Sequence, residues 1–127
     1  MKIEAIIPTA GLGKRFQGKL PKALVLLQGQ PIVVHTLKIF EKSSLIDGIV
    51  LVAPSKYLPV FRKIIAQYHL RKVRKVIAGG QTRGESVKNG LRVTGEDTDT
   101  IVVHDGVRPL LAEDILHKAI KLCKRFG

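Results

Sequence analysis

The sequence predicts an α/β fold with a mainly parallel sheet. Four short β-branched runs alternate with longer segments of helical periodicity, which is the pattern of strands joined by helical crossovers. The runs are nearly continuous in apolar character, as parallel strands covered on both faces are. Glycine-rich or Asp-Gly segments follow several of these runs, so the chain turns sharply where each strand ends. We expect residues 1–127 to form a single domain.

In the first part of the chain, Ile3–Pro8 reads as an apolar strand, and Leu24–Leu27 followed by Gly29-Gln30 reads as a small extra strand and turn. Pro31–Lys42 predicts a helix with proline in its first turn, a position where the missing N–H costs nothing. One face of this helix is apolar and consists of Val33, Leu37 and Phe40.

Three more strands are expected at Gly48–Ala53, Val73–Ile77 and Thr100–His104. Helices are expected at Lys56–Gln67 and, shorter, at Glu85–Val93. A last helix is expected at Ala112–Phe126, with an apolar stripe formed by Ile115, Ala119 and Leu122.

Right-handed crossovers between these strands give the spatial order 3-2-1-4, in which the first and fourth strands are neighbours. Their carboxyl ends then flank the point where the winding reverses, and ligands bind to open α/β sheets at such points. The order therefore predicts that Thr9–Lys22 lies beside Asp105–Pro109.

The chain carries 22 Lys and Arg against 10 Asp and Glu, a formal charge of +12 that attracts polyanions. Much of the excess lies at Arg62-Lys63, Arg71–Lys75 and Lys118–Arg125, which we expect to form solvated faces. Aromatic residues are only 5% of the chain and no nucleic-acid motif is recognised, so we expect no nucleic-acid partner.

No run of eighteen apolar residues occurs, and the amino terminus lacks the pattern of a signal peptide. We therefore expect no membrane partner. Cys123 is the only cysteine, which excludes an internal disulfide and fits a reducing compartment. The expected location is the cytoplasm.

The first strand ends in a glycine-rich, cationic segment that predicts a phosphate-binding loop. Glycines let the backbone approach an anion and turn its N–H groups towards it, and neighbouring cations neutralise the charge. The segment satisfies neither the Walker phosphate loop nor the dinucleotide fingerprint. Its glycines are Gly11 and Gly13, and the cations that crowd the turn are Lys14, Arg15 and Lys22.

Asp105 follows the fourth strand, where a divalent cation could join its carboxylate to phosphates. The alternative is an Asp that only forms a turn before Gly106. Arg108 either contacts phosphate or ties down its own loop, and the sequence does not separate the two. His104 lies within an apolar run, so we expect a packed, hydrogen-bonded core histidine.

The paired glycines of Gly79–Val87 join the third strand to the third helix. They expose backbone groups that could contact the edge of a base, and Ser86 in the first helical turn could add a hydroxyl. This loop lies at the same edge of the predicted sheet as the other two, so it predicts a nucleotide-base pocket.

Together these segments resemble the 2-C-methyl-D-erythritol 4-phosphate cytidylyltransferases, and the related ribitol 5-phosphate cytidylyltransferases share much of the pattern. The resemblance covers essentially the whole chain. It rests on four ordered blocks, Pro8-x-Ala10-Gly11-x-Gly13-x-Arg15, Pro21-Lys22, Gly79-Gly80-x-x-Arg83-x-x-Ser86-Val87 and His104-Asp105-x-x-Arg108-Pro109. Thr9 departs from the alanine that the family commonly has there, and its hydroxyl is expected against the nucleotide.

The resemblance implies a Rossmann-like nucleotidyltransferase fold and a Mg²⁺-dependent transfer of CMP from CTP to a sugar-alcohol phosphate. Arg15 and Lys22 would be the catalytic cations. Asp105 would hold the Mg²⁺–nucleotide complex. The remaining CTP contacts would come from Ala10, Gly11, Gly13, Gly80, Gln81 and Ser86.

The family's chains continue well beyond this length, so the resemblance implies that residues 1–127 hold the CTP-binding half of a sheet that is incomplete at its carboxyl end. We expect a homo-oligomer, or dependence on the missing half, because the fourth strand would be an exposed edge. Methylerythritol phosphate is the preferred acceptor. A ribitol 5-phosphate enzyme and a non-catalytic CTP-binding fragment are the alternatives.

Overall fold

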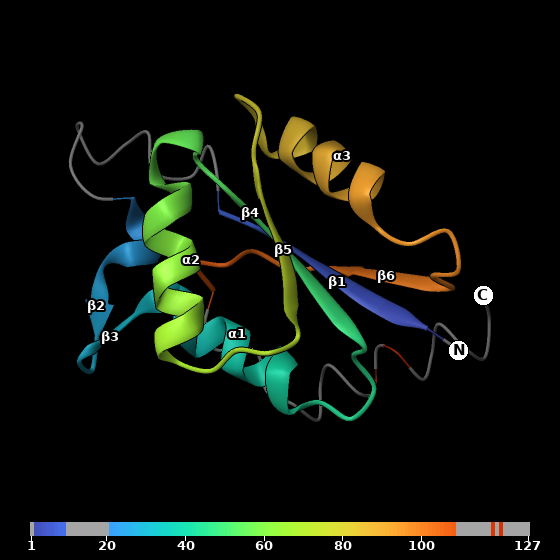
Figure 1. Ribbon diagram of the computed structural model, residues 1–127, viewed down its shortest axis with the longest axis horizontal. Coiled ribbons are helices and arrows are strands. Elements are labelled where there is room, and N and C mark those ends of the chain that lie inside the picture. Colours follow the sequence, from blue (N-terminus) through green and yellow to red (C-terminus); the bar gives the residue numbers. More distant parts are fainter. Residues whose placement is uncertain (1, 10–20, 109–117, 119, 121–127) are drawn as a thin grey trace.

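The computed structural model describes residues 2–9, 21–108, 118 and 120 (Figure 1). The main strands are β1 (Ile3–Pro8), β4 (Gly48–Ala53), β5 (Val73–Ala78) and β6 (Thr100–Val103). The α-helices are α1 (Ile32–Lys42), α2 (Leu58–Gln67) and α3 (Arg83–Val93). Two short strands, β2 (Leu26–Leu27) and β3 (Gln30–Pro31), and two 3-10 helices, η2 (Lys22–Leu24) and η3 (Ser55–Tyr57), complete the elements.

The four main strands form a parallel sheet in the order β5-β4-β1-β6. This is the order 3-2-1-4 that the sequence predicts. The register pairs Ile6 of β1 with Val50 of β4 on one side and with Val103 of β6 on the other. The first and fourth predicted strands are therefore neighbours, and their carboxyl ends reach the same edge of the sheet.

Helices cover both faces of the sheet, with α1 and α2 on one face and α3 on the other (Figure 1). Alternate residues of β1 separate accordingly: Ile7 joins the larger core with α1 and α2, whereas Ile6 joins a smaller core that contains Val93 of α3. A strand buried on both faces needs apolar residues at every position. This explains why Ile3–Pro8 reads as a nearly continuous apolar run, interrupted by Glu4.

The predicted bounds of β1 and β4 are confirmed, and β5 extends one residue further, to Ala78. β6 ends at Val103, one residue before the predicted end. The second helix begins later than predicted, because Tyr57 N–H donates to Pro54 O and closes a 3-10 turn first. The third begins earlier, at Arg83. Lys118 and Ile120 are helical as expected, and the rest of the predicted last helix lies outside the described residues.

The extra strand is shorter than predicted. Leu24 belongs to η2 because its N–H donates to Pro21 O at 2.9 Å, so the strand β2 spans only Leu26–Leu27. Gln28 and Gly29 both have positive φ, 53° and 81°. Such a pair matches the two-residue turns that suit a tight hairpin, and it leads directly into β3 and α1.

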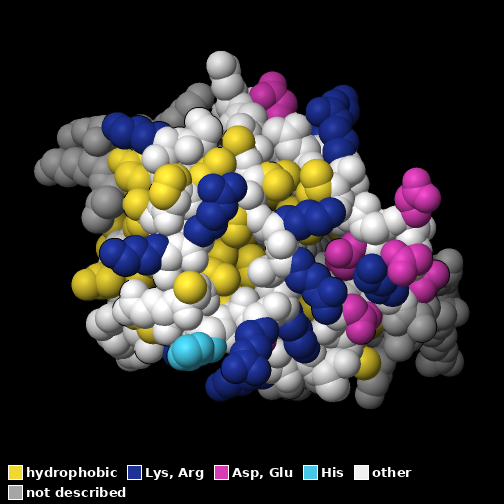
Figure 2. All heavy atoms as spheres, in the orientation of Figure 1, with side chains coloured by type: hydrophobic (Ala, Val, Ile, Leu, Met, Phe, Trp, Pro, Cys, Tyr) yellow, Lys and Arg dark blue, Asp and Glu magenta, His cyan; other side chains and the backbone are white. Residues whose placement is uncertain are grey.

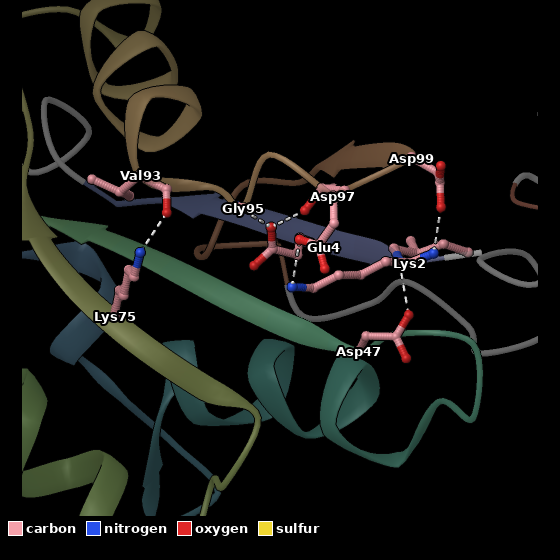
Figure 3. A network of polar contacts seen from close by, with 10 residues as sticks. Lys2, Glu4, Asp47, Lys75, Val93, Gly95, Asp97 and Asp99 are labelled. Atoms are coloured by element: carbon pink, nitrogen blue, oxygen red, sulfur yellow. Dashed lines mark hydrogen bonds and ion pairs between the residues drawn. The ribbon is translucent and has the colours of Figure 1, made fainter.

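A polar network holds the amino-terminal edge of the sheet, at the opposite ends of the strands from the loops considered below (Figure 3). The buried carboxylate of Glu4 accepts hydrogen bonds from Gly95 N–H, at 3.0 Å, and from the Thr98 hydroxyl. Lys2 Nζ lies 3.1 Å from Asp97 Oδ1. The hydrogen bond and charge of Lys2 lower the pKa of Asp97 below its usual value of 3.8. This network fixes the segment that enters β6.

The cations at Arg62, Lys63, Arg71, Arg74 and Lys75 are exposed, as expected for a solvated face. Lys72 departs from this expectation, because it is half-buried and its ammonium group donates to Ser43 O. Lys118 is exposed, and the rest of the third basic run lies outside the described residues. Figure 2 shows Lys and Arg side chains spread over the visible face, while most acidic side chains in view gather on the side of the amino-terminal edge. No helix among the described residues is long and apolar enough to cross a membrane.

Candidate functional site

Three loops follow the carboxyl ends of β1, β5 and β6, and parallel pairing brings these ends to one edge of the sheet. The loop after β6 is bound directly to the end of β1, because Gly106 N–H donates to Pro8 O at 3.1 Å. The chain therefore places Asp105 next to the point where the glycine-rich segment begins, as the predicted strand order requires.

Gly106 occupies a position that admits no side chain. A Cβ atom there would lie 2.5 Å from Cγ2 of Thr9 and 3.1 Å from Cγ2 of Ile7. The buried hydroxyl of Thr36, on α1, donates to Gly106 O at 3.0 Å. This loop is thus fixed by β1 on one side and by α1 on the other.

The Thr9 hydroxyl is bonded inside the fold, where the sequence-based expectation placed it against the nucleotide. Thr9 is buried, and both its N–H and its hydroxyl donate to Val52 O, at 2.7 and 2.8 Å. The extra oxygen that distinguishes threonine from alanine is therefore satisfied by β4. This explains how the chain accommodates a polar residue here.

Lys22 is exposed while its neighbours are buried. It begins η2, in which Ala23 and Leu24 are buried, and the preceding Pro21 is buried too. The buried residues on either side hold this 3-10 turn against the core, while the side chain of Lys22 points into solvent. The geometry therefore holds the Lys22 ammonium group at the surface without using it in the fold of the described residues.

The loop after β5 is shaped by the first turn of α3. Ser86, fully buried, accepts a hydrogen bond from Gly80 N–H at 3.2 Å, and Glu85 Oε2 accepts one from Gln81 N–H at 2.8 Å. A Cβ on Gly80 would lie 2.4 Å from Cβ of Glu85, so only glycine fits. The predicted direct contact of Ser86 with a base is untested, and the observed role of its hydroxyl is to fix the loop.

These contacts determine which groups remain to read a base. The N–H groups of Gly80 and Gln81 are already bonded to side chains. Among the described residues, the carbonyl oxygens of Gly80 and Gln81 accept no hydrogen bond and are therefore available to a ligand. Carbonyl oxygens accept hydrogen bonds, and the exocyclic amine of cytosine donates them.

Asp105 is held by two arginines. Its Oδ1 accepts from Arg83 Nε at 2.8 Å and its Oδ2 from Arg108 Nε at 3.2 Å. The Asp105 side chain is 14% exposed, against 50% for Arg83 and 75% for Arg108. Because Arg83 begins α3, its ion pair joins the loop after β5 to the loop after β6. The two loops predicted to share a cleft edge are thereby in contact.

The donor set around Asp105 fits Mg²⁺ only together with a ligand. No group of three or more acidic, His or Cys side chains that could hold a metal occurs among the described residues. A carboxylate has about four lone-pair sites, so each Asp105 oxygen keeps one beside its arginine. Mg²⁺ commonly binds one or two carboxylates plus substrate phosphates, and Asp105 satisfies that protein share.

His104 is half-buried and not a core residue, which partly corrects the prediction. Its ring packs against Phe40, with centroids 5.7 Å apart, and its Nε2 lies 2.8 Å from Arg108 O. It is hydrogen-bonded as expected. The difference arises because β6 ends at Val103, so His104 already belongs to the loop. Arg108 is thus tied to its own loop through both backbone and side chain.

The predicted phosphate-binding residues of the first loop lie outside the described residues, and their placement stays a prediction. They are Ala10, Gly11, Gly13 and Arg15.

Sequence reasoning left Arg83, Glu85 and Thr36 without a role. The spacing Thr82-x-x-Glu85 is that of a capping box, and this signal could have identified Glu85. The structure shows the Thr82 hydroxyl accepting from Glu85 N–H at 3.1 Å.

Comparison with known proteins gives consistent matches. A family model described as 2-C-methyl-D-erythritol 4-phosphate cytidylyltransferase matches residues 3–126. A protein of that name from Geobacter metallireducens is 46% identical over 123 residues, covering 94% of this chain and 53% of the relative. One from Syntrophus aciditrophicus is 42% identical over 127 residues, covering 99% of this chain and 54% of the relative. The chain thus spans about half the length of these curated relatives.

The fold is shared as well. The crystal structure of 4-diphosphocytidyl-2C-methyl-D-erythritol synthase from Anaerococcus prevotii superimposes with a TM-score of 0.83 at 28% identity. The match covers 98% of this chain and 51% of that one. The described sheet and its loops therefore correspond to one part of a longer fold.

Proposed function

The chain belongs to the 2-C-methyl-D-erythritol 4-phosphate cytidylyltransferase family, and on that premise we propose that it supplies the CTP-binding part of this activity. The reaction is transfer of CMP from CTP to 2-C-methyl-D-erythritol 4-phosphate with release of pyrophosphate. The loop after β5, residues 79–82, is called the base loop. The observation that carries the proposal is the convergence of the base loop, Asp105 and the end of β1, through the Arg83–Asp105 ion pair and the Gly106–Pro8 hydrogen bond.

The base loop favours cytosine on chemical grounds. Its free carbonyl oxygens suit the N4 amine of cytosine, whereas uracil presents an oxygen at the same position. Ser86 and Glu85 would contribute indirectly. Their side-chain oxygens accept from the N–H groups of Gly80 and Gln81 and so keep these donors turned away from the base. Uracil would place its O4 acceptor against a backbone carbonyl oxygen, and no hydrogen bond could form between the two oxygens.

The transfer step depends on neutralisation of phosphate charge and needs no general base to remove a proton from the acceptor. A phosphate oxygen of the acceptor attacks the α-phosphorus of CTP, a P–O bond forms, and the bond to the β-phosphate oxygen breaks to release pyrophosphate. A phosphate monoester has a second pKa of about 6 and is mostly ionised at neutral pH. Arg15 and Lys22 would hold the triphosphate and stabilise the added charge at the α-phosphorus.

Mg²⁺ is part of the proposal, with Asp105 as its protein ligand. When bound, the ion would neutralise phosphate charge and hold the nucleotide against the sheet edge. Arg83 and Arg108 contribute without it, because they fix the direction of the Asp105 carboxylate before any ligand arrives.

We also propose that the 127-residue chain associates with itself or with a completing segment, in the cytoplasm. Among the described residues, β6 pairs with β1 and with no other strand, and Val103 is 37% exposed. An unpaired strand edge is a template for another chain.

Release of pyrophosphate tests the proposal. The chain is incubated with CTP, Mg²⁺ and either 2-C-methyl-D-erythritol 4-phosphate or ribitol 5-phosphate. Release with the first acceptor supports the proposed activity, and release only with the second would assign the alternative acceptor. Binding of CTP without release would identify a non-catalytic CTP-binding chain. Failure to bind CTP would contradict the proposal.

A further inference from the structure

The Asp105 carboxylate is held by two guanidinium groups that differ in where they come from. Arg108 is three residues away in the same loop. Arg83 is 22 residues away and belongs to α3. The Arg83 contact is also the shorter one, 2.8 Å against 3.2 Å, and its side chain is the less exposed. A local contact restrains its own loop, whereas the Arg83 contact restrains one loop relative to another.

Arg83 is itself fixed by the turn that shapes the base loop. The preceding residue, Thr82, caps α3 by accepting from Glu85 N–H at 3.1 Å. Glu85 in turn accepts from Gln81 N–H at 2.8 Å. The same helical turn therefore orients the backbone of Gln81 on one side and the guanidinium of Arg83 on the other. A movement of the base loop should therefore shift Arg83, because the hydrogen bonds Gln81–Glu85 and Glu85–Thr82 connect the two.

The Arg83 contact is made through Nε alone, so the ion pair is not bidentate. One hydrogen bond fixes the position of Oδ1 while leaving that oxygen a further lone pair. This geometry suits a residue that aims a carboxylate at a third group better than one that neutralises it completely.

We propose that Arg83 is a positioning residue that couples the base loop to Asp105. By holding Oδ1, it sets the direction of the carboxylate and transmits the state of the loop at Gly80–Gln81 to it. This inference rests on the proposed function only for the ligands involved. The link between the two loops is a property of the chain alone, and it is tested without any ligand.

The first test measures amide hydrogen exchange of the 127-residue chain by NMR without nucleotide. Gly106 N–H and Arg108 N–H are hydrogen-bonded, to Pro8 O and Asp105 O, and they report on the loop after β6. Arg83→Ala should speed exchange at both amides roughly three- to tenfold, the range expected for losing one partly exposed ionic hydrogen bond. Arg92→Ala is the matched control. It removes the same side chain from the same helix, where, within the described part of the chain, Arg92 Nη1 reaches only Asn89 Oδ1, at 3.5 Å.

The second test measures CTP affinity by calorimetry, once with Mg²⁺ and once with a chelator. The ratio of the two dissociation constants is the Mg²⁺-dependent gain. Arg83→Ala should lower this gain roughly three- to tenfold, Arg83→Lys should restore part of it, and Asp105→Asn should abolish it. Adding Arg83→Ala to Asp105→Asn should then change nothing further, because a residue that acts through Asp105 has no effect without it.

Other results would overturn the proposal. Unchanged exchange at Gly106 and Arg108 in Arg83→Ala would show that the loops are not coupled. An equal loss of CTP affinity with and without Mg²⁺, or a loss that persists beside Asp105→Asn, would show that Arg83 acts elsewhere. A larger Mg²⁺-dependent gain would show that Arg83 competes with the cation. If the unmodified chain binds no CTP but the exchange effect is present, the proposed function fails and the coupling stands.

Discussion

Gly106 and Thr9 are packed so closely that a Cβ atom on the glycine would lie 2.5 Å from Cγ2 of the threonine. The contact joins the loop that carries Asp105 to the end of β1, where the glycine-rich segment begins. Hydrogen bonds of Gly106 to Pro8 O and from Thr36 Oγ1 fix the glycine further. The relative position of the two predicted ligand-binding loops therefore depends on residue 106 being glycine, which has no Cβ atom.

Replacing Gly106 with alanine should destabilise the protein by about 1–3 kcal/mol, because overpacking forces a shift of β1 or of the loop. The free energy of unfolding by chemical denaturation measures it. Gly84→Ala is the matched control. A Cβ there meets nothing closer than Thr82 Oγ1, at 3.9 Å, so the control should be neutral or slightly stabilising in its helix. Equal stability of the two variants would refute the packing argument.

Lys22→Ala should leave the fold intact and slow pyrophosphate release at least about a hundredfold, the loss typical of removing one preorganised charge-stabilising group. The fold is expected to survive because Lys22 is exposed in η2. The measurement is the steady-state rate, with the far-ultraviolet circular dichroism spectrum as the folding check. Lys42→Ala removes another exposed lysine, from the carboxyl end of α1, and should keep the full rate. Near-normal turnover of Lys22→Ala would remove this lysine from the mechanism.

Ser86→Ala should weaken CTP binding even though the serine is buried. Its Oγ accepts from Gly80 N–H, and removing that acceptor leaves the N–H unpaired, at a cost of about 1–3 kcal/mol. The peptide group of Gly80 can then rotate its N–H towards the base, which should reduce the difference in affinity between CTP and UTP. Calorimetry with both nucleotides measures this. Ser55→Ala, in the exposed η3, should bind both nucleotides as the unmodified chain does, and equal behaviour of the two variants would count against Ser86.

The Lys2–Asp97 ion pair should make stability depend on pH only in acid. Lys2 lowers the pKa of Asp97 in the folded protein, so the pair stabilises fully above the unfolded pKa and loses its effect as pH falls through the folded pKa. Subtracting the unfolding free energy of Asp97→Asn from that of the unmodified chain should therefore give a small positive difference at neutral pH that disappears below it. High salt should remove the difference. A difference that grew in acid would contradict the assignment.

Much of the fold could be predicted because its two central strands, β1 and β4, are buried on both faces. Residues such as Ile6 and Ile7 of β1 enter different cores, so the run is apolar at nearly every position and its ends are sharp. The strand order followed from right-handed crossovers together with the reversal of winding in a doubly wound sheet. Boundaries failed where a local hydrogen bond competed with the periodic pattern, as at Leu24, whose N–H closes a 3-10 turn onto Pro21.

The site was predictable as a set of loops but not as a set of contacts. Spacing located Gly80, Ser86 and Asp105 at one edge of the sheet, which the parallel order confirms. It could not show that Ser86 faces Gly80 N–H or that Asp105 faces Arg83. Such pairings join segments through side-chain directions that only the packed structure defines. Thr9 illustrates the same limit, since its hydroxyl turns to Val52 O.

A titration of the 127-residue chain with CTP, UTP and GTP in the presence of Mg²⁺ addresses base recognition most directly. If free carbonyl oxygens of the base loop read the cytosine amine, CTP should bind at least about tenfold more tightly than UTP, the discrimination that one well-placed hydrogen bond gives, and GTP should not bind. Equal affinity for CTP and UTP, or no binding of CTP at all, would contradict a cytidine-triphosphate site at this edge of the sheet.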